Sequence, residues 1–185
     1  MSLPHILLGL TATPTSGYEL KQKFDTTLRH FWFAELSQLY PALKKLVKEG
    51  LAEVETMPSE KGPDKKLYLR TAAGREELLK WLSTGPGTAP LRHPYLAQVF
   101  FLNEHQSHEQ AIKFMEDLLT RIKGTCQTLQ AIEDGWKDED GGYPNQLNDD
   151  DFFTQLTLDA GLRVNKAYIE WCETSLERLK ARAEK

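Results

Sequence analysis

The sequence contains little cysteine and no long apolar run. Its two cysteines, Cys126 and Cys172, are too few and too far apart for a disulfide framework or a zinc site. No apolar stretch approaches the ~20 residues that a membrane-spanning helix requires. The first residues lack the basic region and cleavage site of a signal peptide. We therefore expect a cytoplasmic protein with reduced cysteines and no membrane partner.

Motifs of common enzymes are also missing. The sequence has no Gly-rich phosphate loop, no identifiable pair of catalytic carboxylates and no recognisable Ser-His-Asp arrangement. His105 and His108, each beside a glutamate, have the i, i+3 spacing of a helical metal site, but no third ligand is evident. We expect neither an enzyme nor a cofactor nor a bound metal.

The chain lacks the excess of basic residues that is typical of nucleic-acid-binding proteins. Its net charge is −4, and 40% of its residues are apolar, as in an ordinary globular protein. The charge is unevenly distributed, because residues 1–84 carry +2 and residues 85–185 carry −6. Nucleic acid is therefore a candidate partner only if the lysines of the first half share a face, since local potential concentrates a polyanion.

A stretch rich in proline and glycine divides the chain. The segment STGPGTAPLRHP, residues 83–94, has three prolines and two glycines, so it cannot sustain a helix or a central strand. An α/β pattern precedes it, and only helical patterns follow. We therefore predict a first domain over residues 1–83, a linker over 84–94 and a helical domain over 95–185.

The first domain begins with three predicted helices. Residues 3–12 are apolar and short, and Ser16 can cap a second helix over 18–28. The third helix lies within FAELSQLYPALKKLVKEGL, residues 33–51, and ends at Gly50. Two strands and a fourth helix are predicted to follow.

The spacing of apolar residues changes from the period of a helix to a period of two, which indicates the strands. LAEVET alternates, with Ala52 and Val54 facing away from its two glutamates. After a turn-rich tip, LYLRT forms a returning strand that carries Leu67 and Leu69 on one face. Thr71 can then cap a helix over residues 72–82. Three helices, a hairpin and a helix in this order are typical of a winged helix-turn-helix, although a non-binding adaptor domain could have the same order.

The third helix separates apolar from polar residues on a helical wheel. Its apolar side, expected to pack on the first two helices, consists of Leu36, Leu39, Leu43, Leu46 and Val47. Its opposite side consists of Ser37, Pro41, Lys44, Lys45 and Lys48, with Gln38 and Tyr40 at the flanks. Proline is tolerated only near the first turn of a helix, so Pro41 is expected to lie near the opening turn. The pattern fits either a recognition helix in the DNA major groove or a solvated surface.

Lysines at the hairpin tip favour the first of these interpretations. Lys61, Lys65 and Lys66 concentrate where a wing would contact the phosphate backbone or minor groove. Charged hairpin tips also occur for solubility alone. Lysines on both elements that would face DNA are a more specific indication of DNA binding than lysines on either element alone.

These residues also carry a resemblance to a known family. SGYEL at 16–20, LYPALKKL at 39–46, EGL at 49–51 and KLYLRTAAGREEL at 66–78 resemble the PadR family of winged-helix transcriptional regulators. PLRHPYLAQVFF and YIEWCETSLERL resemble the helical C-terminal domain of the longer PadR subgroup, which is AphA-like (virulence-activator-like). The resemblance implies a mostly α protein with a small β wing that binds double-stranded DNA as a homodimer.

The resemblance also implies roles for individual residues. Tyr18 would approach the DNA backbone, and the groove-facing helix would present Ser37, Gln38, Tyr40, Lys44 and Lys45. Lys65 and Lys66 match the basic pair before the wing tyrosine, Tyr68. The tip is usually richer in arginine, and lysine cannot make the planar bidentate contact of arginine. We therefore expect the wing lysines to position phosphates rather than read sequence.

The second domain is predicted to contain three helices, over residues 95–103, 107–132 and 150–183. The acidic segment 133–150 between the last two is predicted to be a mobile loop. The last helix is too long to be covered by the rest of its own domain, so its apolar stripe favours a second copy of the chain as partner. The residues expected at this dimer interface are Phe153, Leu156, Val164, Tyr168, Trp171, Leu176 and Leu179.

The abundance of aromatic residues leaves two interpretations open. The set comprises Trp32, Phe33, Trp81, Tyr95, Phe100, Phe101, Trp136, Tyr168 and Trp171. These residues either pack in the cores or form a flat apolar pocket that binds a small aromatic effector, as the resemblance suggests.

The leading hypothesis is a transcriptional regulator, expected to be a repressor, on a palindromic operator. The alternative is a winged-helix protein-interaction module that does not bind DNA.

Overall fold

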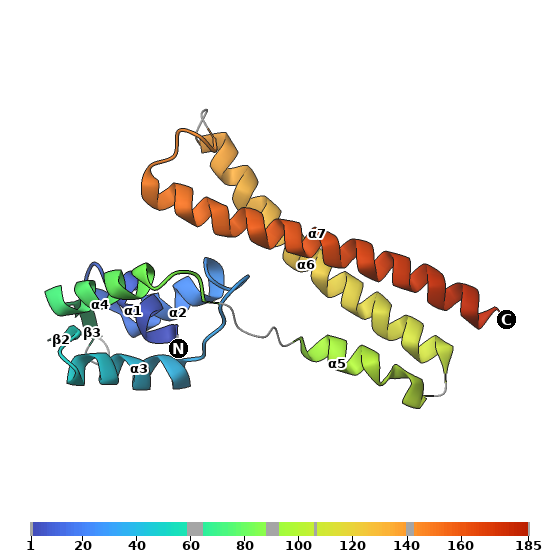
Figure 1. The fold of residues 1–185 in the computed structure, drawn as a ribbon, viewed down its shortest axis with the longest axis horizontal. Helices are drawn as coiled ribbons and strands as arrows, with labels where there is room; N and C mark the ends of the chain where they lie inside the picture. The colour runs from blue at the N-terminus through green and yellow to red at the C-terminus, as the bar shows by residue number, and fades with distance from the viewer. Residues whose placement is uncertain (1, 59–64, 88–92, 106, 140–142, 185) are drawn as a thin grey trace. The chain divides into compact units, whose positions relative to one another are not determined.

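The computed structural model describes residues 2–58, 65–87, 93–105, 107–139 and 143–184. The chain divides into two compact units, residues 1–89 and 90–185, which Figure 1 shows as ribbons. Among the described helices, none is long and apolar enough to cross a membrane.

The first unit has the predicted order of helices and wing strands. Its elements are α1 (Leu3–Leu10), β1 (Thr15–Ser16), α2 (Gly17–Thr26), α3 (Leu36–Lys48), β2 (Ala52–Met57), β3 (Lys65–Arg70) and α4 (Ala72–Ser83). The short strand β1 was not predicted. It pairs antiparallel with β3, which gives a three-stranded sheet in the order β1-β3-β2. The mostly helical fold with a small β wing is therefore confirmed.

The core of this unit lies between α1, α2 and α3. Leu7, Leu20, Phe24, Leu39 and Leu43 have no exposed surface. On α2 and α3 they recur at intervals of four residues, which places them on one face of each helix. The expected cap of α2 is present, because the Ser16 hydroxyl accepts a hydrogen bond from the Glu19 N–H.

Two expectations for α3 are corrected. Leu36 was placed on the buried side, but its side chain is 41% exposed because α3 begins at this residue, one turn before the buried Leu39. Pro41 was expected near the first turn, but it lies at the sixth position of the helix. It therefore leaves the Ser37 carbonyl without the N–H that a non-proline residue would supply at i+4.

The wing buries a different face from the one the sequence suggested. Tyr68 is buried, whereas Leu67 and Leu69 are only half-buried. Val54 opposes Tyr68 across the β2–β3 pair, yet it is exposed, because burial of β2 ends at Ala52. The predicted Gly-Pro turn of the tip lies outside the described residues.

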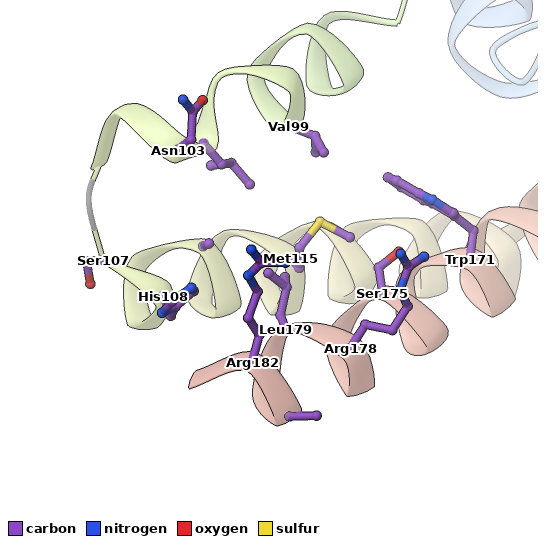
Figure 2. A pocket seen from close by; sticks show the side chains of 13 residues that line it. Val99, Asn103, Ser107, His108, Met115, Trp171, Ser175, Arg178, Leu179 and Arg182 are labelled. Atoms are coloured by element: carbon purple, nitrogen blue, oxygen red, sulfur yellow. The ribbon is translucent and has the colours of Figure 1, made fainter. Parts of the chain in front are cut away.

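The second unit consists of α5 (Pro94–Phe100), the 3-10 helix η1 (Leu102–His105), α6 (His108–Glu139) and α7 (Asp149–Ala183). Figure 1 shows α6 and α7 side by side, and their packing holds the unit together. The predicted first helix is thus divided between α5 and η1. A hydrophobic core around Met115 and Cys172 (Figure 2 shows part of it) packs α5, α6 and α7 together, and a second core around Leu129 and Leu162 lies between α6 and α7.

Part of the predicted mobile loop is helical. α6 continues seven residues beyond the predicted end, to Glu139. Lys137 donates a hydrogen bond to Glu133 over 2.7 Å, four residues earlier on the same helix face, and this contact lowers the pKa of the Glu133 carboxyl. The Tyr143 hydroxyl donates to Glu133 and accepts from Gln155, with distances of 3.1 Å each. These bonds connect the segment after α6 to both long helices.

The apolar stripe predicted on the last helix is partly buried within its own unit and partly exposed. Leu176 is buried against α6 of its own chain, so it stabilises the unit and is not available to a second chain. The residues of α7 that face α6 also include Leu158 and Leu162, which the predicted stripe left out. By contrast, Phe153 and Val164 are exposed.

Candidate nucleic-acid interface

The Glu19 carboxylate makes two separate sets of hydrogen bonds at the start of α2. One oxygen of Glu19 accepts hydrogen bonds from the Ser16 N–H and from the Ser16 hydroxyl, each over 2.7 Å. The other oxygen accepts from the Lys65 ammonium over 3.0 Å. These bonds, first the one from the Ser16 backbone, lower the pKa of Glu19 from 4.5 to about 2. The base of the wing is thereby tied to the first turn of α2.

The same turn of α2 is in close contact with α3. A Cβ added at Gly17 would lie 2.7 Å from the Tyr40 ring, so any other residue at this position would require the ring to move. Sequence reasoning did not single out Gly17. Its position directly after a serine cap and before an exposed tyrosine was the available signal.

These two contacts bring predicted residues of three elements together. Tyr18 lies between Gly17, which touches Tyr40, and Glu19, which binds Lys65. The Tyr18 side chain is 76% exposed. The first turn of α2 therefore meets α3 through Tyr40 and the wing through Lys65, and the exposed Tyr18 lies in that turn.

The exposed face of α3 continues along the helix from this meeting point. Ser37, Tyr40 and Lys44 are spaced by three and four residues, which places them on one side, and all three are exposed. Lys48 continues the same side one turn further. Hydroxyl, phenol and ammonium groups in this order can bind base edges at the start of the helix and phosphates at its end.

Two predicted contact residues are already engaged in the free chain. The Gln38 side-chain oxygen accepts a hydrogen bond from the Glu35 N–H over 3.0 Å, which leaves its NH₂ group as the donor for a ligand. The Lys45 ammonium lies 3.7 Å from the Glu49 carboxylate. Gln38 thus helps to begin α3, and the charge of Lys45 is partly offset.

The wing lysines differ in their surroundings. Lys66 points to the opposite face of β3 from Lys65, because side chains alternate along a strand. Within the described part of the chain, Lys44, Lys48 and Lys66 have no carboxylate within 4.0 Å. Lys61 lies outside the described residues. Among the described residues of α3 and the wing, the cations available for phosphate are therefore Lys44, Lys48 and Lys66, while Lys65 supports the wing.

Of the histidine pair near the start of α6, only one side chain is described. His108 is described, but the side chain of His105 is not. No group of three or more His, Cys, Asp or Glu side chains that could hold a metal occurs among the described residues.

Comparison with known proteins supplies the family. Residues 6–80 match the transcriptional regulator PadR-like family, and residues 91–180 match the C-terminal domain family of the virulence activator. Over 182 residues the chain is 30% identical to the negative transcriptional regulator PadR of Bacillus subtilis (strain 168), with 94% of this chain and 95% of that protein covered. The chain belongs to the PadR family. PadR-family proteins are DNA-binding transcriptional regulators, so the predicted family is confirmed.

Solved PadR-family structures have the same fold. B. subtilis PadR in complex with operator DNA matches with a TM-score of 0.78 at 29% identity, covering 97% of this chain and 99% of that chain. The same protein in complex with p-coumaric acid matches with a TM-score of 0.74 at 28% identity, with the same coverage. The Vibrio cholerae virulence activator AphA matches with a TM-score of 0.75 at 26% identity, covering 98% and 100%.

Proposed function

We propose that this PadR-family chain represses transcription as a homodimer bound to a roughly palindromic operator. The observation that carries the proposal is the meeting of the α2 start, the exposed α3 face and the wing base around Gly17, Glu19 and Tyr40. It is supported by B. subtilis PadR, a negative transcriptional regulator that has been solved with operator DNA.

In this proposal α3 enters the major groove. Ser37, Tyr40 and the NH₂ group of Gln38 lie toward the start of the helix, where a recognition helix reads base edges. Tyr18 and Lys66 contact phosphates on either side, which fixes the register of the helix without reading sequence. Two such helices in a symmetric dimer would occupy successive major grooves, about 34 Å apart.

A small aromatic molecule is the effector that we propose. B. subtilis PadR has been solved with p-coumaric acid, an aromatic carboxylic acid. This chain has a cluster of aromatic side chains in its second unit, in which the Tyr95 and Tyr168 hydroxyls each lie 3.1 Å from a ring nitrogen of His93. An effector bound in this unit would lower operator affinity by changing the separation of the two recognition helices.

A protein-interaction module without DNA binding is the second candidate. It is favoured by the carboxylates that already bind Lys65 and Lys45, and by the net charge of −6 on residues 85–185. Both observations reduce the attraction for a polyanion.

Selection of bound fragments from random duplex DNA tests the proposal. We expect two inverted half-sites with centres 10–11 base pairs apart, or about one helical turn. Lys66→Ala should weaken binding to all fragments alike and select the same sequence, whereas Gln38→Ala should change the selected bases. Selection of no duplex by the wild-type chain would leave the interaction module as the function, and identical behaviour of the two variants would overturn their assigned roles.

A further inference from the structure

The start of α3 carries large apolar side chains that the core of the first unit does not cover. Leu36, the first residue of the helix, is 41% exposed, and Phe33, three residues earlier, is 59% exposed. The other leucines of the helix, Leu39, Leu43 and Leu46, are buried. Single exposed apolar residues are common on proteins, but two of them at one end of one helix form an apolar surface that a ligand can cover.

This end of α3 is held in place by α2 and by its own first turn. The Lys21 ammonium of α2 lies 5.6 Å from the centre of the Phe33 ring and 3.7 Å from the Glu35 carboxylate. The Glu35 N–H donates a hydrogen bond to the Gln38 side chain one turn further on. Leu36 directly follows Glu35, so its position relative to α2 is fixed by these contacts.

Leu36 lies on the side of α3 that is proposed to face DNA. Leu36, Tyr40 and Lys44 follow one another at intervals of four residues, so each points about 40° from the next at 100° per residue. All three side chains are exposed. Tyr40 is also in close contact with Gly17 of α2. The apolar start of α3 therefore continues directly into its row of phenol and ammonium groups.

The chemistry of the major groove indicates what such a surface can bind. The apolar group that a base pair presents there is the C5-methyl of thymine. A methyl group forms no hydrogen bond, so the hydroxyl, phenol and amide groups of α3 cannot recognise it by hydrogen bonding. An exposed leucine side chain can remove it from water, which is favourable for apolar surface. Cytosine at the same position would lack the methyl group and would leave the leucine exposed.

We propose that Leu36 recognises a thymine of the operator through the C5-methyl group, with Phe33 enlarging the apolar surface at this end of the helix. The thymine would adjoin the bases that Ser37 and Tyr40 contact. The inference rests on the proposed function, because it requires α3 in the major groove. It adds an apolar, base-specific contact to the polar contacts of that helix.

Replacement of thymine by deoxyuridine tests this proposal, because it removes only the methyl group and keeps the hydrogen-bonding groups of the base pair. The duplex is the one that the wild-type chain selects from random DNA, and its thymines are replaced one at a time. We expect at least one position at which the replacement weakens wild-type binding about fourfold, the equivalent of one buried methyl-sized group. Fluorescence anisotropy of the labelled duplexes measures the affinities.

Substitutions of leucine assign the effect to Leu36. In Leu36→Ala, binding of the thymine duplex should be weakened, and the deoxyuridine replacement at the same position should then have little further effect, because the two changes remove one contact. Leu36→Met keeps a large apolar side chain and should retain the preference for thymine. The matched control is Leu82→Ala, which shortens another exposed leucine, on α4, and should keep the fourfold effect. Circular dichroism checks that each variant is folded.

The outcomes separate this inference from the proposed function. A wild-type chain that selects no duplex would overturn both. If the wild-type chain selects a duplex but tolerates deoxyuridine at every thymine, the thymine contact alone is overturned. The same conclusion follows if the fourfold loss persists in Leu36→Ala or disappears in Leu82→Ala.

Discussion

At the scale of single residues, two glycines determine how closely elements approach each other. A Cβ added at Gly74 of α4 would lie 2.0 Å from the Leu51 carbonyl oxygen, a backbone atom that cannot turn aside. At Gly17 the obstacle would be the Tyr40 ring, which can rotate. Gly74 therefore serves the fold of the first unit, and Gly17 serves the contact between α2 and α3.

Substitution of Gly74 should be far more harmful than its sequence context suggests. We expect Gly74→Ala to lower the free energy of unfolding by about 2 kcal/mol or more, because the methyl group forces α4 away from the β2 side of the core. The matched control is Gly9→Ala in α1, where an added Cβ has open space, and this change should stabilise the helix by roughly 0.5–1 kcal/mol. Urea titration measures both. Equal effects of the two substitutions would contradict the close approach of Gly74 to the Leu51 carbonyl oxygen.

At the scale of elements, the Glu19 carboxylate links the α2 cap to the wing. Its pKa of about 2 lies below the ordinary value of 4.5, mainly through the bonds from Ser16 and then through Lys65. A carboxyl whose pKa is depressed by folding stabilises the folded state fully above pH 4.5. This contribution disappears as the pH falls toward 2.

Stability measured against pH should reveal this link. The difference in melting temperature between the wild-type chain and Glu19→Gln should be constant near neutral pH and should shrink as the pH falls from 4.5 to 2. Glutamine can still accept the bond from the Ser16 N–H, so the cap is partly kept while the ion pair with Lys65 is removed. A difference that does not change over this range would mean that Glu19 is not held as described.

The elements also show what a sequence can and cannot predict. The order of helices and wing strands, the Ser16 and Thr71 caps and the exposed lysine side of α3 follow from local patterns. The burial of Tyr68 rather than of Leu67 and Leu69 does not, because β1 and the helices decide which face of β3 is covered. For the same reason the sequence could not show that Leu176 packs on α6.

The long helices illustrate a further limit of local patterns. The acidic, glycine-containing segment after Ile132 predicted a loop, yet the Glu133–Lys137 pair lies within α6 and supports another two turns of helix. α7 has one apolar face for α6 and another that remains exposed at Phe153 and Val164. A single sequence gives both faces equal weight, so only the structure separates internal packing from a surface for a partner.

At the scale of the whole molecule, the charge of each unit matters more than the net charge of −4. The lysines without carboxylate partners in the described residues include Lys44, Lys48 and Lys66, which lie on α3 and the wing. The acidic balance of the second half does not oppose DNA binding if these three ammonium groups bind phosphates directly. Binding should then be strong at low salt and should weaken steeply as salt is added.

The most direct test measures the affinity of the chain for a labelled random-sequence duplex as a function of salt, from about 50 to 200 mM. The account predicts a straight, falling plot of log K against log salt for the wild-type chain. In a variant in which Lys44, Lys48 and Lys66 are replaced by glutamine, the slope should be less steep by about 0.9 for each phosphate that is no longer neutralised. The control carries the same replacements at three exposed lysines elsewhere, Lys80, Lys113 and Lys166, and should keep the wild-type slope. No binding at the lowest salt, or an equal slope for both variants, would contradict the claim that this face of α3 and the wing bind DNA.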